Sequence, residues 1–255
     1  PDTTPLTTLL EEKGDEIFRD ADSIALELDM DKEIVKRVFA YAQKYHKSVY
    51  AVVSNMTIAV ERRDFLQQTD CFVCNRQEAG ILFSEDYAGK TPEELRQLHE
   101  MGLSDLHIGV ESGSDPILLW MNKGVTSFEM LQAFQMLDRA EIGYFVTIIL
   151  GLGGKTYRNL HAIETANLLN RIHPKCIWAL KLKIWEDTPL EKMVKKGEFV
   201  PMSNRDILFE ERLLLESLTL DTYFMDTTVM DALTIQGYLP ETKDSMLRVI
   251  NRLLS

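Results

Sequence analysis

The clearest indication of the fold lies in His107-Ile-Gly-Val-Glu-Ser-Gly-Ser-Asp-Pro-Ile-Leu-Leu-Trp-Met-Asn-Lys-Gly124. An apolar run that ends at Val110 predicts a buried strand. Asp115 and Pro116 open a predicted helix, since proline suits the first helical turn. The polar bend between them contains Gly113, which permits a sharp turn of the backbone. Polar side chains at the carboxyl end of such a strand form ligand sites in α/β proteins. The alternative is an ordinary capped turn that binds nothing.

Apolar patterns of strand type and helix type alternate along most of the chain. The alternation predicts an α/β fold of right-handed βαβ units with a parallel sheet. Under this prediction the strands of both halves can share one continuous sheet. The predicted strands cover residues 23–28, 48–53, 70–75, 107–110, 143–150, 176–184 and 222–226, and the predicted helices cover 31–45, 57–66, 77–83, 127–139, 159–171, 203–218 and 243–254.

A second glycine-rich bend follows another predicted strand. Gly143–Leu150 is a near-continuous apolar run, as is typical of strands buried on both faces of a parallel sheet. It ends in Gly151-Leu-Gly-Gly154, where glycine lets the backbone approach a ligand closely. A plain loop is the alternative. Because the carboxyl ends of parallel strands meet at one edge, we predict that this bend and the Glu111 bend line one cleft.

Lysines and histidines of the C-terminal half offer further polar groups. In the strand predicted for residues 176–184, Lys181 and Lys183 share one face. If that face points inward, the lysines meet an anionic substrate, and if it points outward, they are simply solvated. His161 and His173 lie near predicted helix ends, and we interpret both as surface groups.

Three separated motifs resemble, in their order, the radical S-adenosylmethionine superfamily. They are Gly102-Leu-Ser-Asp-Leu-His-Ile-Gly-Val-Glu-Ser-Gly-Ser-Asp115, Met121-Asn-Lys-Gly124 and Ile148-Ile-Leu-Gly-Leu-Gly-Gly154, and the resemblance covers about Lys90 to the C-terminus. It implies the later strands of an incomplete βα barrel of the TIM-barrel type. In that family the Glu-Ser-Gly bend lies beside S-adenosylmethionine. The implied ligand-binding residues are Glu111, Ser112, Ser114, Gly151, Gly153, Gly154 and Lys181.

The iron–sulfur loop of that superfamily, Cys-x-x-x-Cys-x-x-Cys, does not occur in this sequence. The three cysteines are Cys71, Cys74 and Cys176. If residues 70–74 form a strand, Cys71 and Cys74 point to opposite faces, since three residues is an odd step along a strand. We therefore expect no 4Fe–4S cluster and no metal on these cysteines, and we interpret them as buried structural residues.

The first part, from about Thr7 to Lys90, resembles the ribokinase-like sugar kinases. The resembling segments are Ala21-Asp-Ser-Ile24, Lys44-Tyr-His-Lys-Ser-Val-Tyr50 and Asp70-Cys-Phe-Val-Cys-Asn-Arg-Gln-Glu-Ala79. Asn75 and Glu78 match the Asn-x-x-Glu motif of that family, which acts around the metal and phosphates and implies Mg-ATP. Taken alone, the pair is also explained as a helix cap with its capping-box partner. The family's Gly-Ala-Gly-Asp motif is absent, so we expect no kinase activity from this chain alone.

The two resemblances divide the chain into predicted domains 1–90 and 91–255. No linker rich in glycine, serine or proline marks the changeover, and we interpret the sequence as a chimera or a fragment. The chain begins with Pro1 rather than Met, which indicates processing, trimming or a longer parent. Its last segments resemble the usual C-terminal end of the radical S-adenosylmethionine superfamily, so we expect that end to be complete.

Composition limits the partners of the chain. A formal charge of −12 and an isoelectric point near 4.9 argue against nonspecific binding of nucleic acid. No apolar run is long enough to span a bilayer, which argues against a membrane protein. Since no signal peptide is present either, we expect a cytoplasmic protein with a small-molecule ligand.

These observations favour a radical S-adenosylmethionine-like domain that keeps part of a ligand cleft but is catalytically incompetent as this chain. Two alternatives stay open. One is a kinase remnant that binds a nucleotide or a sugar phosphate, and the other is a structural or interaction domain without activity. The sequence assigns no catalytic residue, substrate or oligomeric state, and whether the chain is an enzyme stays undecided.

Overall fold

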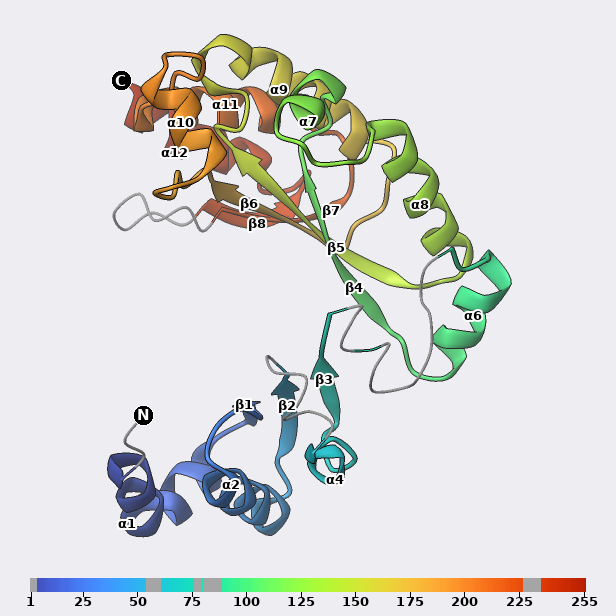
Figure 1. The fold of residues 1–255 in the computed structure, drawn as a ribbon, viewed down its shortest axis with the longest axis vertical. Coiled ribbons are helices and arrows are strands. Elements are labelled where there is room, and N and C mark those ends of the chain that lie inside the picture. The colour runs from blue at the N-terminus through green and yellow to red at the C-terminus, as the bar shows by residue number, and fades with distance from the viewer. Residues whose placement is uncertain (1–3, 54–60, 76–78, 80–88, 227–234) are drawn as a thin grey trace. The chain divides into compact units, whose positions relative to one another are not determined.

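The computed structural model describes residues 4–53, 61–75, 79, 89–226 and 235–255 (Figure 1). The chain divides into two compact units, Pro1–Gly89 and Lys90–Ser255. Each unit has a sheet of its own, with the strand orders β1-β2-β3 and β4-β5-β6-β7-β8. The described strands thus form two sheets and not the one continuous sheet that the sequence left possible.

The first unit packs helices against a three-stranded parallel sheet. Its elements are α1 (Thr4–Asp20), β1 (Ser23–Glu27), α2 (Lys32–Tyr45), β2 (Ser48–Val52), α4 (Arg63–Leu66) and β3 (Cys71–Val73). Asp31 caps α2, because its side chain accepts hydrogen bonds from the backbone N–H groups of Glu33 and Ile34. The apolar face of α2, including Val35 and Phe39, is buried in the core of this unit. Nearly all of the helix predicted for residues 77–83 lies outside the described residues.

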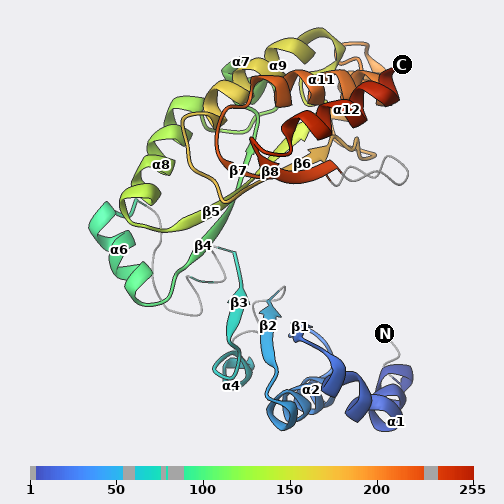
Figure 2. The same cartoon turned by 180° about the vertical axis from the view of Figure 1, so that it is seen from behind.

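The second unit is built on a five-stranded sheet whose helices cover one face (Figures 1 and 2). Strands β4 to β7 are parallel, and β8 pairs with β7 in the antiparallel sense. The elements are α6 (Pro92–Glu100), β4 (Asp105–Glu111), α7 (Asp115–Trp120), α8 (Ser127–Arg139), β5 (Gly143–Leu150), α9 (Gly154–Leu169), β6 (Cys176–Lys181), α10 (Pro189–Lys195), α11 (Asn204–Ser217), β7 (Thr222–Asp226), β8 (Ile235–Leu239) and α12 (Lys243–Leu254).

Side chains of β5 alternate between the two faces of this sheet. Tyr144, Val146 and Ile148 are buried in the core that α8, α9, α11 and α12 complete. Phe145 and Thr147 point to the other face and are only half-buried. The prediction that β5 is buried on both faces is therefore wrong. The helices of this unit pack on one face of its sheet, and the side chains of the other face are only half-buried.

Two neighbouring carboxyl groups of α11 point into this core. Glu210 and Glu211 are both 0% exposed. Neither oxygen of Glu211 has a hydrogen-bond partner in the part of the chain that the structure describes. Burial is the largest cause that raises the pKa of Glu211 well above its ordinary value, and the charges of Asp226 and Glu210 add to it.

We predict that Glu211 makes the second unit less stable as the pH rises. Its folded pKa is raised, so the stability is fully present below the unfolded pKa, near 4.5, and is lost as the pH rises through the folded pKa. Glu211→Gln removes the charge, and it should flatten this dependence and stabilise the unit by about 1–3 kcal/mol at pH 8.

Urea unfolding followed by tryptophan fluorescence tests this prediction, since Trp120, Trp178 and Trp185 all lie in the second unit. Glu216→Gln, on the exposed side of α11, is the matched control and should change little. An unchanged pH dependence in Glu211→Gln would contradict the prediction.

Candidate functional site

The bend after β4 holds its glutamate in a strained conformation. Glu111 has a φ of 61°, and the N–H of Ser112 donates to the carbonyl of Val110 over 2.8 Å, which closes a three-residue turn. The pairing of β4 with β5 shifts register between Gly109 and Glu111. A Cβ built on Gly109 would lie 2.1 Å from Oε1 of Glu111. Glycine at position 109 therefore leaves the space into which the Glu111 carboxylate folds.

The Glu111 carboxylate is the accessible part of this bend. It lies 3.3 Å from Nζ of Lys123 and accepts a hydrogen bond of 3.3 Å from Oγ1 of Thr147, while its side chain stays 21% exposed. Ser112 and Ser114 are 0% exposed, and the Ser112 hydroxyl accepts from the N–H of Ser114 over 3.0 Å. The two serines therefore shape the bend from inside, and a ligand on the surface meets Glu111 first.

The glycine bend follows β5, the parallel neighbour of β4, so the two bends lie at the same edge of the sheet. That they line one cleft stays a prediction. Gly151, Gly153 and Gly154 are all buried. A Cβ on Gly151 would lie 2.9 Å from a methyl group of Ile207, and a Cβ on Gly154 would lie 3.0 Å from the carbonyl of Val200. These glycines allow close packing against neighbouring segments of the unit.

A buried histidine and a buried glutamate join the two bends. His161 of α9 is 1% exposed, so the interpretation of His161 as a surface group is wrong, whereas His173 is exposed as expected. Nδ1 of His161 lies 2.9 Å from Oε1 of Glu210, and Nε2 lies 3.3 Å from the carbonyl oxygen of Glu111. The other oxygen of Glu210 accepts a 2.6 Å hydrogen bond from the N–H of Gly151.

The backbone groups at the two ends of this series of hydrogen bonds, the Glu111 carbonyl and the Gly151 N–H, decide which atoms donate. The Glu111 carbonyl can only accept, so Nε2 of His161 carries a proton. Nδ1 of the same ring contacts Glu210. Both bends are thereby fixed through side chains of α9 and α11. Sequence periodicity placed His161 on a helix but did not show which neighbour that helix packs against.

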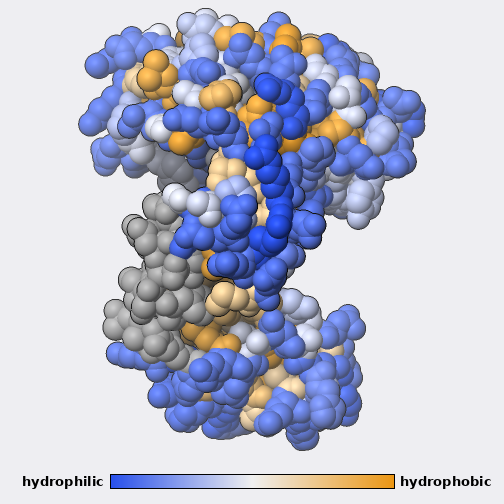
Figure 3. All heavy atoms as spheres, turned by 90° about the vertical axis from the view of Figure 1, so that its right-hand side faces the viewer, coloured by the Kyte–Doolittle hydropathy of each residue, from blue (hydrophilic) through white to orange (hydrophobic). Residues whose placement is uncertain are grey.

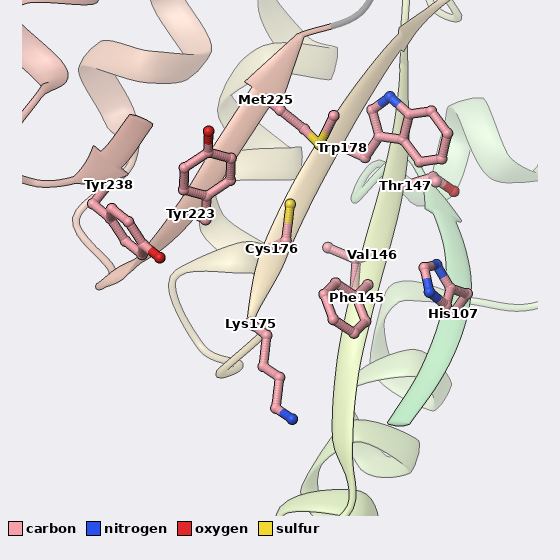
Figure 4. Close-up of a pocket in the computed structure, with 10 residues that line it drawn as sticks. All are labelled: His107, Phe145, Val146, Thr147, Lys175, Cys176, Trp178, Tyr223, Met225 and Tyr238. Atoms are coloured by element: carbon pink, nitrogen blue, oxygen red, sulfur yellow. The ribbon is translucent and has the colours of Figure 1, made fainter. Parts of the chain in front are cut away.

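The half-buried face of the second sheet carries a hollow of about 480 Å³ (Figure 4). One row of register partners crosses all five strands and forms part of its lining: His107, Phe145, Cys176, Tyr223 and Tyr238. The rings of His107 and Phe145 stack with centroids 4.7 Å apart, and those of Tyr223 and Tyr238 meet edge-on at 4.9 Å. Burial raises the pKa of the Cys176 thiol between them.

The next row places the hollow beside Glu111. Thr147, Trp178 and Met225 are successive register partners and also line the hollow. Since Thr147 donates to Oε2 of Glu111, the carboxylate lies at the edge of this aromatic surface. The sequence analysis did not predict the hollow. Large side chains two positions apart on a strand, such as Tyr223 and Met225, share one face of the sheet and could have indicated it.

Lys181 is not among the residues that line the hollow. Lys181 ends β6, and its Nζ donates to Oδ1 of Asn204 at the start of α11. Asn75 is exposed after β3, and Glu78, its predicted partner, lies outside the described residues. The structure therefore neither assembles nor excludes the Asn75–Glu78 site.

The described cysteines do not fit a 4Fe–4S cluster. Cys71 is exposed, Cys74 is half-buried, and Cys176 is buried in the second unit. Across the residues that the structure describes, no group of three or more histidine, cysteine, aspartate or glutamate side chains is arranged to hold a metal ion. The interpretation of all three cysteines as buried structural residues is wrong for Cys71, which is exposed.

We predict that the His161–Glu210 pair stabilises the site. His161→Ala leaves the Glu210 carboxylate buried without its partner, and this should lower the free energy of unfolding of the second unit by about 3–5 kcal/mol. His173→Ala is the control, because that imidazole pairs with Asp138 while 81% exposed and should contribute less than about 1 kcal/mol. Urea titration followed by tryptophan fluorescence measures both, and equal losses would refute a special role for His161.

No family profile matches the chain, but distant likenesses to known proteins exist. Over 119 residues the chain is 28% identical to the tRNA-2-methylthio-N(6)-dimethylallyladenosine synthase of Sulfurihydrogenibium sp. (strain YO3AOP1), covering 42% of this chain and 27% of that protein. The structure is similar to the archaeal Methanocaldococcus infernus Elp3 with an N-terminal deletion (1-46), at a TM-score of 0.52 and 12% identity, covering 91% of this chain and 62% of that one.

The chain thus spans only part of each of these proteins. No helix in the described ranges is both long and apolar enough to cross a membrane, and the side of the molecule in Figure 3 is mostly hydrophilic. The structural likeness shows an α/β fold with parallel sheet segments, as predicted for the C-terminal part. A ribokinase-like origin of the first unit is supported by neither likeness. The structural likeness, at 12% identity, extends to the fold alone.

Proposed function

We propose that the Lys90–Ser255 unit binds S-adenosylmethionine in the aromatic hollow, with the Glu111 carboxylate at its edge, and that this chain does not cleave the ligand reductively. The observation that carries the proposal is the combination of one carboxylate with aromatic side chains from five neighbouring strands. The resemblance to the radical S-adenosylmethionine superfamily supports the same ligand.

The chemistry of the ligand matches this lining. S-adenosylmethionine carries a sulfonium cation, a planar adenine ring and an α-ammonium group. Aromatic faces attract cations and stack on planar rings, and each effect is stronger where water is excluded. A cavity of about 480 Å³ lies within the usual range for small-molecule sites. A neutral apolar ligand would fill the hollow but would gain nothing from the carboxylate.

Each group has a distinct task in the proposed complex. Thr147 orients the Glu111 carboxylate through its hydroxyl, and Lys123 balances the negative charge from the other side. The Trp178 indole supplies a large flat surface between Thr147 and Met225. Bound S-adenosylmethionine supplies an electrophilic sulfonium centre. The described cysteines do not form the loop that holds a reducing cluster, so we derive no radical step for this chain.

The kinase alternative has less support. Neither likeness to known proteins is to a sugar kinase. A small-molecule ligand and a cytoplasmic location remain predictions from the sequence.

Calorimetric titration of the full chain tests the proposal. S-adenosylmethionine should bind about tenfold more tightly than S-adenosylhomocysteine, which is a neutral thioether, because cation–π and carboxylate attraction to the sulfonium contribute about 1–2 kcal/mol. Trp178→Leu and Glu111→Gln should each reduce this preference severalfold.

Trp185→Leu is the matched control for the tryptophan variant, since that indole is 61% exposed and does not line the hollow. It should bind both ligands like the unmodified chain. Equal affinity for the two ligands, or binding that Trp178→Leu leaves unchanged, would overturn the proposal.

A further inference from the structure

We propose a second ligand site, which binds phosphate groups, on the surface shared by α9 and α11. Three guanidinium groups surround the Phe209 ring there. The Cζ atoms of Arg158, Arg205 and Arg212 lie 5.5, 5.6 and 5.2 Å from the centre of the ring. Arg158 comes from α9 and the other residues come from α11, two helices that pack together in the second unit (Figure 1). Because a ring has two faces, at least two guanidinium groups share one face.

The positive charge of this arginine cluster is only partly balanced. The Asp206 carboxylate forms ion pairs with two cations. Its Oδ2 lies 3.6 Å from Nζ of Lys155, and its Oδ1 lies 3.4 Å from Nη1 of Arg158. Hydrogen bonds from Ser203 lower the pKa of Asp206, so this carboxylate is ionised and already well occupied. The cluster therefore retains positive charge in a chain whose formal charge is −12.

The other two arginines are balanced less well. Nε of Arg212 lies 3.7 Å from Oε1 of Glu216, and its Nη1 donates to the neutral Oδ1 of Asn251 over 3.4 Å, so one distant carboxylate balances this charge. Arg205 is exposed and forms no ion pair within the described ranges. Like charges repel when they are held close together, and this arrangement gains most from an anion that several guanidinium groups can share.

A phosphate group fits this arrangement better than a single carboxylate. Its several oxygens accept hydrogen bonds from more than one guanidinium group at once. A lysine ammonium group lacks the planar pair of donors that makes such contacts bidentate. Contact with the Phe209 ring orders the arginines before the ligand arrives, and this lowers the entropic cost of binding. The side chains of Arg158 and Arg212 are 30% and 35% exposed, so donors remain open to solvent.

This site is separate from the aromatic hollow. The core that α9 and α11 form with the sheet lies on the face opposite Phe145 and Thr147. The inference therefore does not rest on binding of S-adenosylmethionine, and either proposal can fail while the other stands.

The test is a thermal-shift and calorimetric titration of the full chain with inorganic pyrophosphate, against sodium chloride of equal ionic strength. Pyrophosphate should raise the midpoint of the second unit, and Arg205→Gln should weaken binding by about tenfold, as expected for the loss of one charge-assisted hydrogen bond. Arg205→Lys should restore only part of the affinity if the planar fork matters. Arg139→Gln, an exposed arginine on α8 outside the cluster, should bind like the unmodified chain.

A single-stranded oligouridylate distinguishes the source of the phosphate. If it binds more than tenfold more tightly than pyrophosphate, and loses that affinity in Arg205→Gln, the site takes the phosphodiesters of a nucleic acid. If pyrophosphate binds as well or better, the site takes a small phosphorylated molecule. Binding of neither probe, or binding that Arg205→Gln and Arg139→Gln reduce equally, overturns the inference.

Discussion

The candidate site depends on a polar bridge that is wholly enclosed by protein. The ends of parallel strands leave the ladder of backbone hydrogen bonds, so nothing in the sheet itself fixes one bend against the next. His161 and Glu210 supply that fixation from the helices, by contacting the carbonyl of Glu111 and the N–H of Gly151. Thr165, one turn after His161, accepts from the N–H of Gly113 over 3.0 Å. Removal of these groups from water is costly, and the cost is offset only because each has a partner.

The two faces of the second sheet show how packing separates stability from binding. One face is filled by aliphatic and aromatic side chains that contact the helices, such as Val146 and Phe134. On the other face the same strands present rings to a hollow. Since successive side chains of a strand point in opposite directions, a single apolar strand serves both purposes. The buried face holds the strands in register, and this register aligns the rings of the open face into rows.

Local patterns were sufficient for many elements and insufficient for long-range arrangement. The predicted helix 127–139 and strand 143–150 match α8 and β5 at both ends, because a Thr126–Glu129 capping box and a continuous apolar run act within a few residues. The common location of the Glu111 bend and the glycine bend could be predicted, because the carboxyl ends of parallel strands meet at one edge of a sheet. The burial of His161 required the packing of α9 on α11, and the separate sheets required knowledge of which strands pair. Neither is encoded in periodicity along one segment.

The backbone at Glu111 has a consequence for engineering of this protein. A left-handed φ costs a side-chain-bearing residue roughly 1–2 kcal/mol, and glycine would avoid that cost. A campaign aimed only at thermostability would therefore select glycine at this position and erase the one carboxylate that borders the hollow. The change that relieves the backbone at position 111 is thus also the change that removes the side chain on which the proposed ligand site depends.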